Sequence, residues 1–98
     1  MLVKVIKSYR EIIAICDSEL IGKKFEEGKF QLDVKESFYN GKEMPEEETI
    51  GIIKLMSKED ATFNIVGEKS VNAALKAGII SEQGIKTIQG VPFALVLL

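Results

Sequence analysis

The chain contains no histidine and only one cysteine, Cys16. Without histidine it lacks the commonest general base and a preferred ligand for transition metals. A single cysteine cannot form a disulfide within the chain, and this composition is typical of proteins from the reducing cytoplasm. We therefore expect a cytoplasmic protein without a cofactor, and these absences weaken the case for an enzyme.

A large excess of one charge and long apolar runs are also absent from the sequence. The thirteen basic and fifteen acidic residues give a net charge of −2, which does not favour nucleic acid as a partner. The apolar C-terminal run "VPFALVLL" is shorter than a membrane span, and lysines interrupt the apolar N-terminus. Because the length suits one hydrophobic core, we expect a single domain over residues 1–98 without a membrane segment.

Patterns of β-rich residues predict the first half of the fold. Two such runs, residues 2–7 and 11–16, flank the polar "SYRE", which is typical of a β-hairpin. Asp17 or Ser18 can then cap a helix of one or two turns. The run "KFQLDVK", residues 29–35, alternates apolar and polar side chains and predicts a half-solvated strand.

Two helices are predicted in the second half. Pro45 fits the first position of a helix over residues 46–57, whose first turn carries three glutamates. The strand-like "TFNIV" leads into a helix over residues 68–77, which Gly78 ends, and two short strands follow. The predicted fold is α+β. Its mixed, mainly antiparallel sheet opens with a β-hairpin, and two or three helices pack mainly on one face.

The stretch "NIVGEKSV" is the nearest approach to a nucleotide-binding loop. Such a loop needs two glycines five positions apart, followed directly by lysine and a hydroxyl residue. Here Thr62 stands five positions before Gly67, and Glu68 separates that glycine from Lys69. A glutamate is instead favourable at the positive end of a helix. We interpret the stretch as a strand entering a helix, with a phosphate site at the helix-end amides as the alternative.

Cys16 and nearby carboxylates are the candidates for catalysis. A thiol beside helix-end amides can have a lowered pKa and act as a nucleophile. No histidine is present to accept its proton, however, and Asp17 opposes a thiolate. We favour a small buried residue that closes a strand. The alternative is a small enzyme that uses Cys16 or the carboxylates Asp17 and Glu68.

A basic edge beside aromatic residues raises a different class of function. Lys23 and Lys24 could hold phosphates while Phe38 and Tyr39, if exposed, stack on bases. Scattered solvated lysines explain the same residues. RNA is therefore kept as an alternative partner.

The C-terminal run predicts a contact outside the monomer. An extended strand places Val91, Phe93, Leu95 and Leu97 on one face and Ala94, Val96 and Leu98 on the other. Helices on one side of a sheet cover only one such face, which leaves aliphatic surface and a strand edge exposed. We expect a protein partner there, with a homodimer through the C-terminal strand as one form. The alternative is a central strand buried on both faces.

Three segments together resemble a family of small archaeal proteins known only as a domain of unknown function. They are "CDSELIGKKFEEGKFQLDVKESFYNG", "NIVGEKSV" and "IQGVPFA". The matching positions are Cys16, Asp17, Gly22, Phe38, Tyr39, Gly41, Asn64, Gly67, Glu68, Gly90, Val91 and Pro92. Phe93 stands where the family pattern has histidine, which argues against a catalytic histidine. The resemblance implies a fold class and a cytoplasmic location, supplies no activity, and implies association with translation components only as an alternative.

We therefore predict a non-catalytic binding or adaptor module. The alternatives are an RNA- or translation-associated binding protein and a small enzyme. The candidate functional surface comprises Cys16, Asp17, Lys23, Lys24, Phe38, Tyr39, Asn64, Gly67, Glu68 and Lys69. No residue is predicted to be catalytic or to bind a cofactor or a metal.

Overall fold

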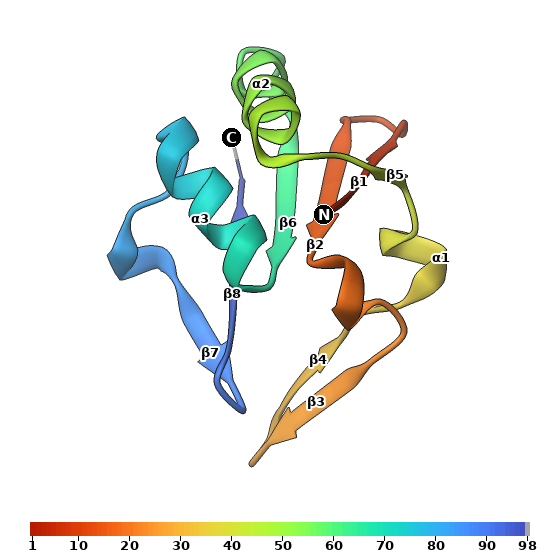
Figure 1. Ribbon diagram of the computed structural model, residues 1–98, viewed down its shortest axis with the longest axis vertical. Helices are drawn as coiled ribbons and strands as arrows, with labels where there is room; N and C mark the ends of the chain where they lie inside the picture. The colour runs from red at the N-terminus through yellow and green to blue at the C-terminus, as the bar shows by residue number, and fades with distance from the viewer. Residues whose placement is uncertain (98) are drawn as a thin grey trace.

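The structure is a computed structural model that describes residues 1–97. Its largest element is a six-stranded sheet with the strand order β5-β1-β2-β6-β8-β7 (Figure 1). The strands are β1 (Leu2–Ile6), β2 (Ile12–Cys16), β5 (Lys42–Glu43), β6 (Thr62–Val66), β7 (Lys86–Ile88) and β8 (Val91–Val96). β2 and β6 run parallel, whereas the other neighbouring pairs are antiparallel. The predicted α+β fold with a mixed, mainly antiparallel sheet is confirmed.

The predicted opening hairpin is also confirmed. β1 and β2 pair in antiparallel orientation along their full lengths. Because side chains alternate along a strand, Ile13 and Ile15 point to one face of the sheet and Ala14 and Cys16 to the other. All four side chains are fully buried. β2 is therefore a central strand that is covered on both faces.

Two helices cover the first face of the sheet (Figure 1). They are α2 (Glu46–Ser57) and α3 (Glu68–Ala77), with the predicted bounds. Ile53 of α2 and Val71 of α3 share one buried cluster with Phe63 of β6. The helices thus bury the apolar side chains that the central strands point toward them.

The ends of these helices follow from local chemistry. Pro45 was predicted at the first helical position of α2, but it precedes the helix with an extended backbone. Its carbonyl accepts hydrogen bonds from the amide and the hydroxyl of Thr49, each 3.0 Å long. Pro45 thus closes the first turn from outside the helix, where its missing N–H costs nothing. Gly78 ends α3 with a φ of 83°, as predicted.

The second face of the sheet is covered at one end only. The covering elements are η1 (Ser18–Leu20), a separate two-stranded sheet of β3 (Lys24–Glu27) and β4 (Phe30–Asp33), and α1 (Glu36–Tyr39). Val34 and Tyr39 pack there against Cys16 and Val66 of the main sheet. Figure 1 shows the β3–β4 hairpin extending beyond the main sheet.

Sequence patterns predicted this covering segment less well. The helix expected after Cys16 is a single 3-10 turn, η1, and the strand expected within residues 29–35 is present as β4. Phe30, however, is 71% exposed, because β4 belongs to the projecting hairpin. β3 and α1 were not predicted, since charged residues in "KKFEEG" and "KESFY" hide the apolar periodicity of both elements.

The remaining connection is η2 (Glu82–Gly84), which joins α3 to β7. Across residues 1–97, none of the helices has the length and apolar composition needed to cross a membrane.

Candidate functional site

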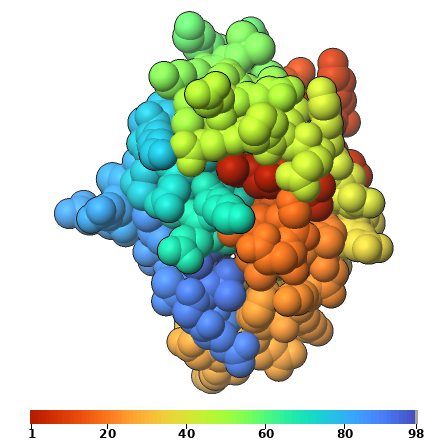
Figure 2. All heavy atoms as spheres, viewed as in Figure 1, coloured from red at the N-terminus to blue at the C-terminus, as the bar shows by residue number. Residues whose placement is uncertain are grey.

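Three segments that are far apart in the sequence meet at one end of the main sheet. They are the end of β2 with Asp17, the β6–α3 turn at Gly67, and the β7–β8 turn that leads into Pro92. In Figure 2 the orange, teal and blue surfaces of these segments meet below α3. A pocket of about 160 Å³ lies between them, lined by Asp17, Glu19, Leu20, Gly67, Glu68, Gly90, Val91 and Pro92. We call this region the junction.

Asp17 is the polar centre of the junction and is almost fully buried. Its Oδ1 accepts hydrogen bonds from the Ser70 amide at 2.8 Å and the Ser70 hydroxyl at 2.7 Å. Its Oδ2 accepts a bond from the Lys69 amide at 3.1 Å. The carboxylate therefore caps α3, whose first amides have no partners within the helix and whose dipole favours negative charge.

The prediction that Asp17 or Ser18 caps the helix that follows Cys16 was wrong. Asp17 precedes η1, but no side chain makes a capping hydrogen bond to that turn. A single 3-10 turn presents few free amides, whereas α3 presents its first turn beside the end of β2. The longer helix thus takes the carboxylate.

Gly67 allows the Asp17 carboxylate to approach α3. Its φ of 107° is a conformation that residues with a Cβ rarely adopt, and an added Cβ would collide with that carboxylate. The Gly67 amide also donates to the Pro92 carbonyl at 2.8 Å, which attaches the third segment. The strand-to-helix interpretation is confirmed, because β6 leads through Gly67 into α3. Asp17 occupies the Lys69 and Ser70 amides, which argues against the phosphate alternative.

Cys16 is fully buried beside the junction. Burial, and to a smaller extent the charge of Asp17, raises the pKa of its thiol from 9.0 to about 11. Only the thiolate is a strong nucleophile, so burial and the raised pKa both disfavour reaction of Cys16 near neutral pH. Within residues 1–97, no three His, Cys, Asp or Glu side chains are placed to hold a metal ion.

The expected basic and aromatic surface does not form as predicted. Tyr39 is buried, and burial raises the pKa of its hydroxyl to about 12. Phe38 is half-buried and packs edge to face against Tyr39, with ring centroids 5.0 Å apart. Lys23 and Lys24 are both exposed; Lys23 precedes the β3–β4 hairpin and Lys24 is its first residue. The two aromatic rings therefore complete the core and offer no exposed stacking platform.

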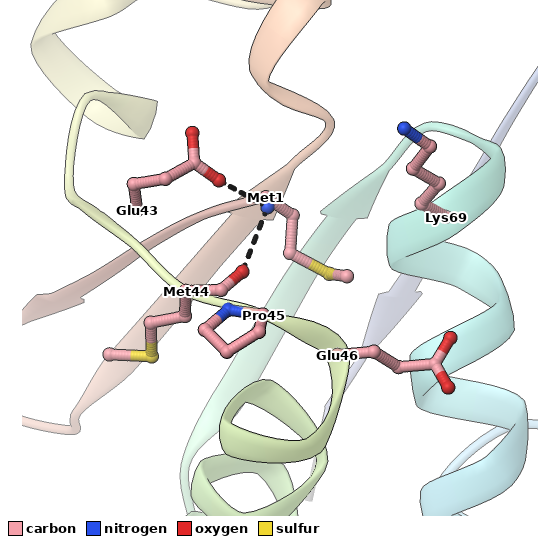
Figure 3. A pocket seen from close by; sticks show the side chains of 6 residues that line it. All are labelled: Met1, Glu43, Met44, Pro45, Glu46 and Lys69. Carbon is pink, nitrogen blue, oxygen red and sulfur yellow. Dashed lines mark hydrogen bonds and ion pairs between the residues drawn. The ribbon is translucent and has the colours of Figure 1, made fainter.

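A larger pocket of about 440 Å³ lies beside the start of α2. It is lined by Met1, Glu43, Met44, Pro45, Glu46 and Lys69 (Figure 3). The Met1 amino group donates to Glu43 Oε2 at 2.5 Å and to the Met44 carbonyl at 2.9 Å. The Ser18 hydroxyl donates to Glu43 Oε1 at 2.5 Å, and these two hydrogen bonds to its carboxylate lower the pKa of Glu43. Lys69 faces this pocket, whereas its neighbour Glu68 faces the junction.

Sequence reasoning missed Glu43. Its partner Met1 lies 42 positions away, and no local pattern connects the two residues. Only the pairing of β5 with β1 brings them together.

Asn64 belongs to a different part of the molecule from the other candidates. It lies on β6 opposite Ala14 of β2 on one side and Leu95 of β8 on the other. These residues share the second face of the sheet, at the end that α1 and the β3–β4 hairpin leave open. Leu95 and Leu97 are 60% and 71% exposed there. We call the leucine strip the set formed by these two leucines and their half-buried neighbours Ile12, Thr62 and Asn64.

The chain was compared with known families, curated proteins and solved structures. Residues 6–98 match the model of a family described as "Protein of unknown function (DUF424)". No curated protein matches the chain. A solved structure described as an uncharacterized conserved protein from Methanopyrus kandleri has a TM-score of 0.85 and 24% identity, covering 98% of this chain and 90% of that chain. That likeness shows a shared fold. Since the family match spans almost all residues, the chain belongs to the DUF424 family, as its three resembling segments predicted.

Proposed function

We propose that the protein is a non-catalytic binding or adaptor module of the cytoplasm, which binds a protein partner through the leucine strip. The observation that carries this proposal is the exposure of Leu95 and Leu97 on the open end of the second face. Apolar surface of this kind gains free energy when a partner removes it from water. Exposed apolar patches on small proteins therefore often mark interaction sites.

The chemistry of the junction favours binding over catalysis. A catalytic site needs a group that is free to accept or donate a proton, or a nucleophile that is activated. Both oxygens of Asp17 already accept hydrogen bonds from α3, and the Cys16 thiol keeps its proton. In the part of the chain that the structure describes, no buried side-chain nitrogen or oxygen lacks a hydrogen-bond partner. The junction is thus better suited to holding the fold together.

The charge distribution favours a protein partner over RNA. Lys86 is the last charged residue of the sequence, so β8 and the leucines beside it carry no cation. Binding to nucleic acid depends strongly on the neutralisation of phosphates by Lys and Arg. The burial of Tyr39 also removes one of the two rings expected to stack on bases.

Capture from an extract of the source cells tests the proposal. The unaltered chain and the double variant Leu95→Ser/Leu97→Ser serve as baits, and captured proteins are identified by mass spectrometry. The partner should be retained by the unaltered chain and reduced about 10-fold or more by the double variant, which corresponds to about 1.4 kcal/mol of lost binding free energy.

Leu55→Ser provides the matched control. Leu55 is an exposed leucine on α2, away from the strip, and is 56% exposed. This variant should capture the same proteins as the unaltered chain. Equal capture by all three baits would contradict the proposal. Recovery of RNA that is lost as salt rises would favour the alternative partner.

A further inference from the structure

The backbone of β8 has an open edge where the leucine strip lies. The Gly67 amide donates to the Pro92 carbonyl, so the polar groups of Pro92 face β6. Because these groups alternate sides along a strand, those of Ala94 and Val96 also face β6. The N–H and C=O groups of Leu95 consequently point away from β6, toward the other edge. Leu97 follows the last residue of β8, and an extended backbone there would place its groups on the same side.

β7 covers only the first part of that edge. It pairs with β8 from Val91 to Phe93 and no further. Figure 1 shows β7 diverging from β8 beyond the turn that joins them. Leu95 and Leu97 therefore present apolar side chains to the open face and unpaired backbone groups to the open edge.

The open part of β8 also lacks the usual protection of an edge strand. Natural sheets blunt their edges with lysines, prolines, bulges or covering elements. Pro92 lies at the start of β8, in the part that pairs with β7, and no charged residue follows Lys86. An uncharged strand of this kind can pair with an identical strand without placing like charges opposite each other.

We infer that the partner of the leucine strip is a second copy of this chain, whose β8 pairs antiparallel with β8 across a two-fold axis. A two-fold contact uses the same surface on both copies, which suits a strand that offers donors and acceptors equally. With Val96 on the axis, Leu95 lies opposite the partner's Leu97, and the outward groups of both leucines are satisfied. The two six-stranded sheets then become one continuous sheet. This inference rests on the proposed function, because it names the partner of the same strip.

Amide hydrogen exchange and sedimentation equilibrium test the inference on the unaltered protein over one concentration series. We expect the mass of two chains at high concentration. The Leu95 and Leu97 amides should exchange about 100-fold more slowly as the dimer forms, because exchange then requires the paired edge to open. A monomer at every concentration, or a dimer in which the Leu95 amide still exchanges rapidly, would overturn the inference.

The Val5 amide is the internal control. Met44 donates to the Met1 carbonyl, so by the same alternation the groups of Val5 point to the opposite edge of the sheet. β5 pairs with β1 only at Leu2 and Val3, which leaves Val5 beyond it. The Val5 amide should exchange rapidly at all concentrations.

Leu95→Pro separates edge pairing from simple apolar contact. Proline removes the outward N–H of residue 95 and leaves the Ala94 and Val96 bonds to β6 in place. The dimer dissociation constant should rise about 10-fold or more. Circular dichroism checks that the variant folds, and Leu95→Lys, which adds an edge charge, replaces it if it does not. A dimer of unchanged affinity in the folded variant would overturn the inference.

The two proposals fail in different ways. An unaltered chain that stays monomeric, while Leu95→Ser/Leu97→Ser still loses captured proteins, would refute the second copy and leave the proposed function standing. A dimer that persists in this double variant, together with equal capture by the double variant and the unaltered chain, would refute both.

Discussion

The junction and the leucine strip occupy opposite ends of the same two strands, β6 and β8, and they use their polar groups differently. At the junction, Asp17 and Gly67 are joined by hydrogen bonds to α3 and to the start of β8. At the strip, Leu95 and Leu97 are exposed beside an edge that β7 does not reach. Asp17 and Gly67, which sequence reasoning singled out, thus hold the fold together. The aliphatic Leu95 and Leu97 remain exposed and are available for a partner.

The two edges of the sheet differ in the same sense. Beyond β5, the open edge of β1 is flanked by Lys4 and Lys7, and Lys42 lies on β5 itself. Such charges discourage pairing with another strand. The open part of β8 has none, since Lys86 lies on β7. We therefore expect this part of the edge to be better suited to association. Changes at the junction should therefore alter stability and spare binding, whereas changes at the strip should do the reverse.

The largest loss of stability is expected for Gly67→Ala. The φ of 107° strains any residue with a Cβ, and the new methyl group would displace the Asp17 carboxylate from α3. Strain and lost hydrogen bonds together should lower the free energy of unfolding by about 4 kcal/mol. Urea denaturation measures the change. Gly51→Ala is the control: an added Cβ on this helical glycine meets no neighbouring atom, so a gain of about 0.5–1 kcal/mol is expected. An unchanged free energy of unfolding in Gly67→Ala would contradict the role assigned to the junction.

A smaller loss is expected for Asp17→Asn. The asparagine oxygen can still accept from Ser70, but its amide group would face the Lys69 N–H, and the charge at the helix start is lost. We expect the free energy of unfolding to decrease by about 2 kcal/mol, as measured by thermal or urea denaturation. Glu19→Gln, at an exposed residue of the same pocket, should change stability by less than about 0.5 kcal/mol. Equal effects from both variants would argue that Asp17 does not hold the junction.

Stability should also fall at high pH. In the folded state the pKa of Cys16 is raised to about 11 and that of Tyr39 to about 12. The unfolded chain loses these protons at lower pH, beginning near 9.0 for the thiol. Between the unfolded-state and folded-state pKa of each group, the unfolded state binds fewer protons than the folded state. The free energy of unfolding is therefore highest below pH 9 and decreases as pH rises through this range. Unfolding curves from pH 8 to 11 measure the decrease, and a flat profile would contradict it.

Thiol labelling gives a second reading of the same site. At pH 8 the raised pKa leaves about 100-fold less thiolate in the folded protein than in the unfolded chain. Labelling of native Cys16 should be slower by at least this factor. Rapid labelling would reopen the case for an enzyme. Cys16→Ala should keep only the part of the pH dependence that Tyr39 contributes.

The smallest effect on stability is expected for Leu95→Ser/Leu97→Ser. Both side chains are mostly exposed, so the free energy of unfolding of the monomer should change by about 0.5 kcal/mol or less. Association should nevertheless be lost. Chemical denaturation of the dilute protein measures the first quantity, and sedimentation measures the second. Unfolding of the double variant would show that the strip belongs to the core.

The sequence predicted those elements whose local patterns match their tertiary roles. α2 and α3 bury one regular face each, so helical periodicity marked them, and two β-rich runs around a polar turn marked the hairpin. The β3–β4 hairpin and α1 cover one end of the second face with few buried side chains. The apolar periodicity of their sequences is therefore weak, and it predicted these elements poorly. The exposure of Leu95 agrees with the predicted strand faces, whereas the burial of Tyr39 depends on how α1 packs.

The candidate residues were found more readily than their roles. Cys16, Asp17 and Gly67 do come together, but no local pattern indicates that Asp17 reaches over Gly67 to cap α3. That contact joins residues 52 and 53 positions apart and exists only because β2 and β6 run side by side. Asn64, grouped with them by sequence, lies instead in the leucine strip, because β6 passes from one region to the other.

The most direct test of the account is the amount of partner captured by folded Asp17→Asn protein, measured beside Leu95→Ser/Leu97→Ser at a temperature where both give native circular dichroism spectra. We predict that Asp17→Asn captures as much partner as the unaltered chain, while the double variant captures about 10-fold less or none. Loss of the partner in folded Asp17→Asn, with full capture by the double variant, would show that the junction is the binding site and would contradict the account.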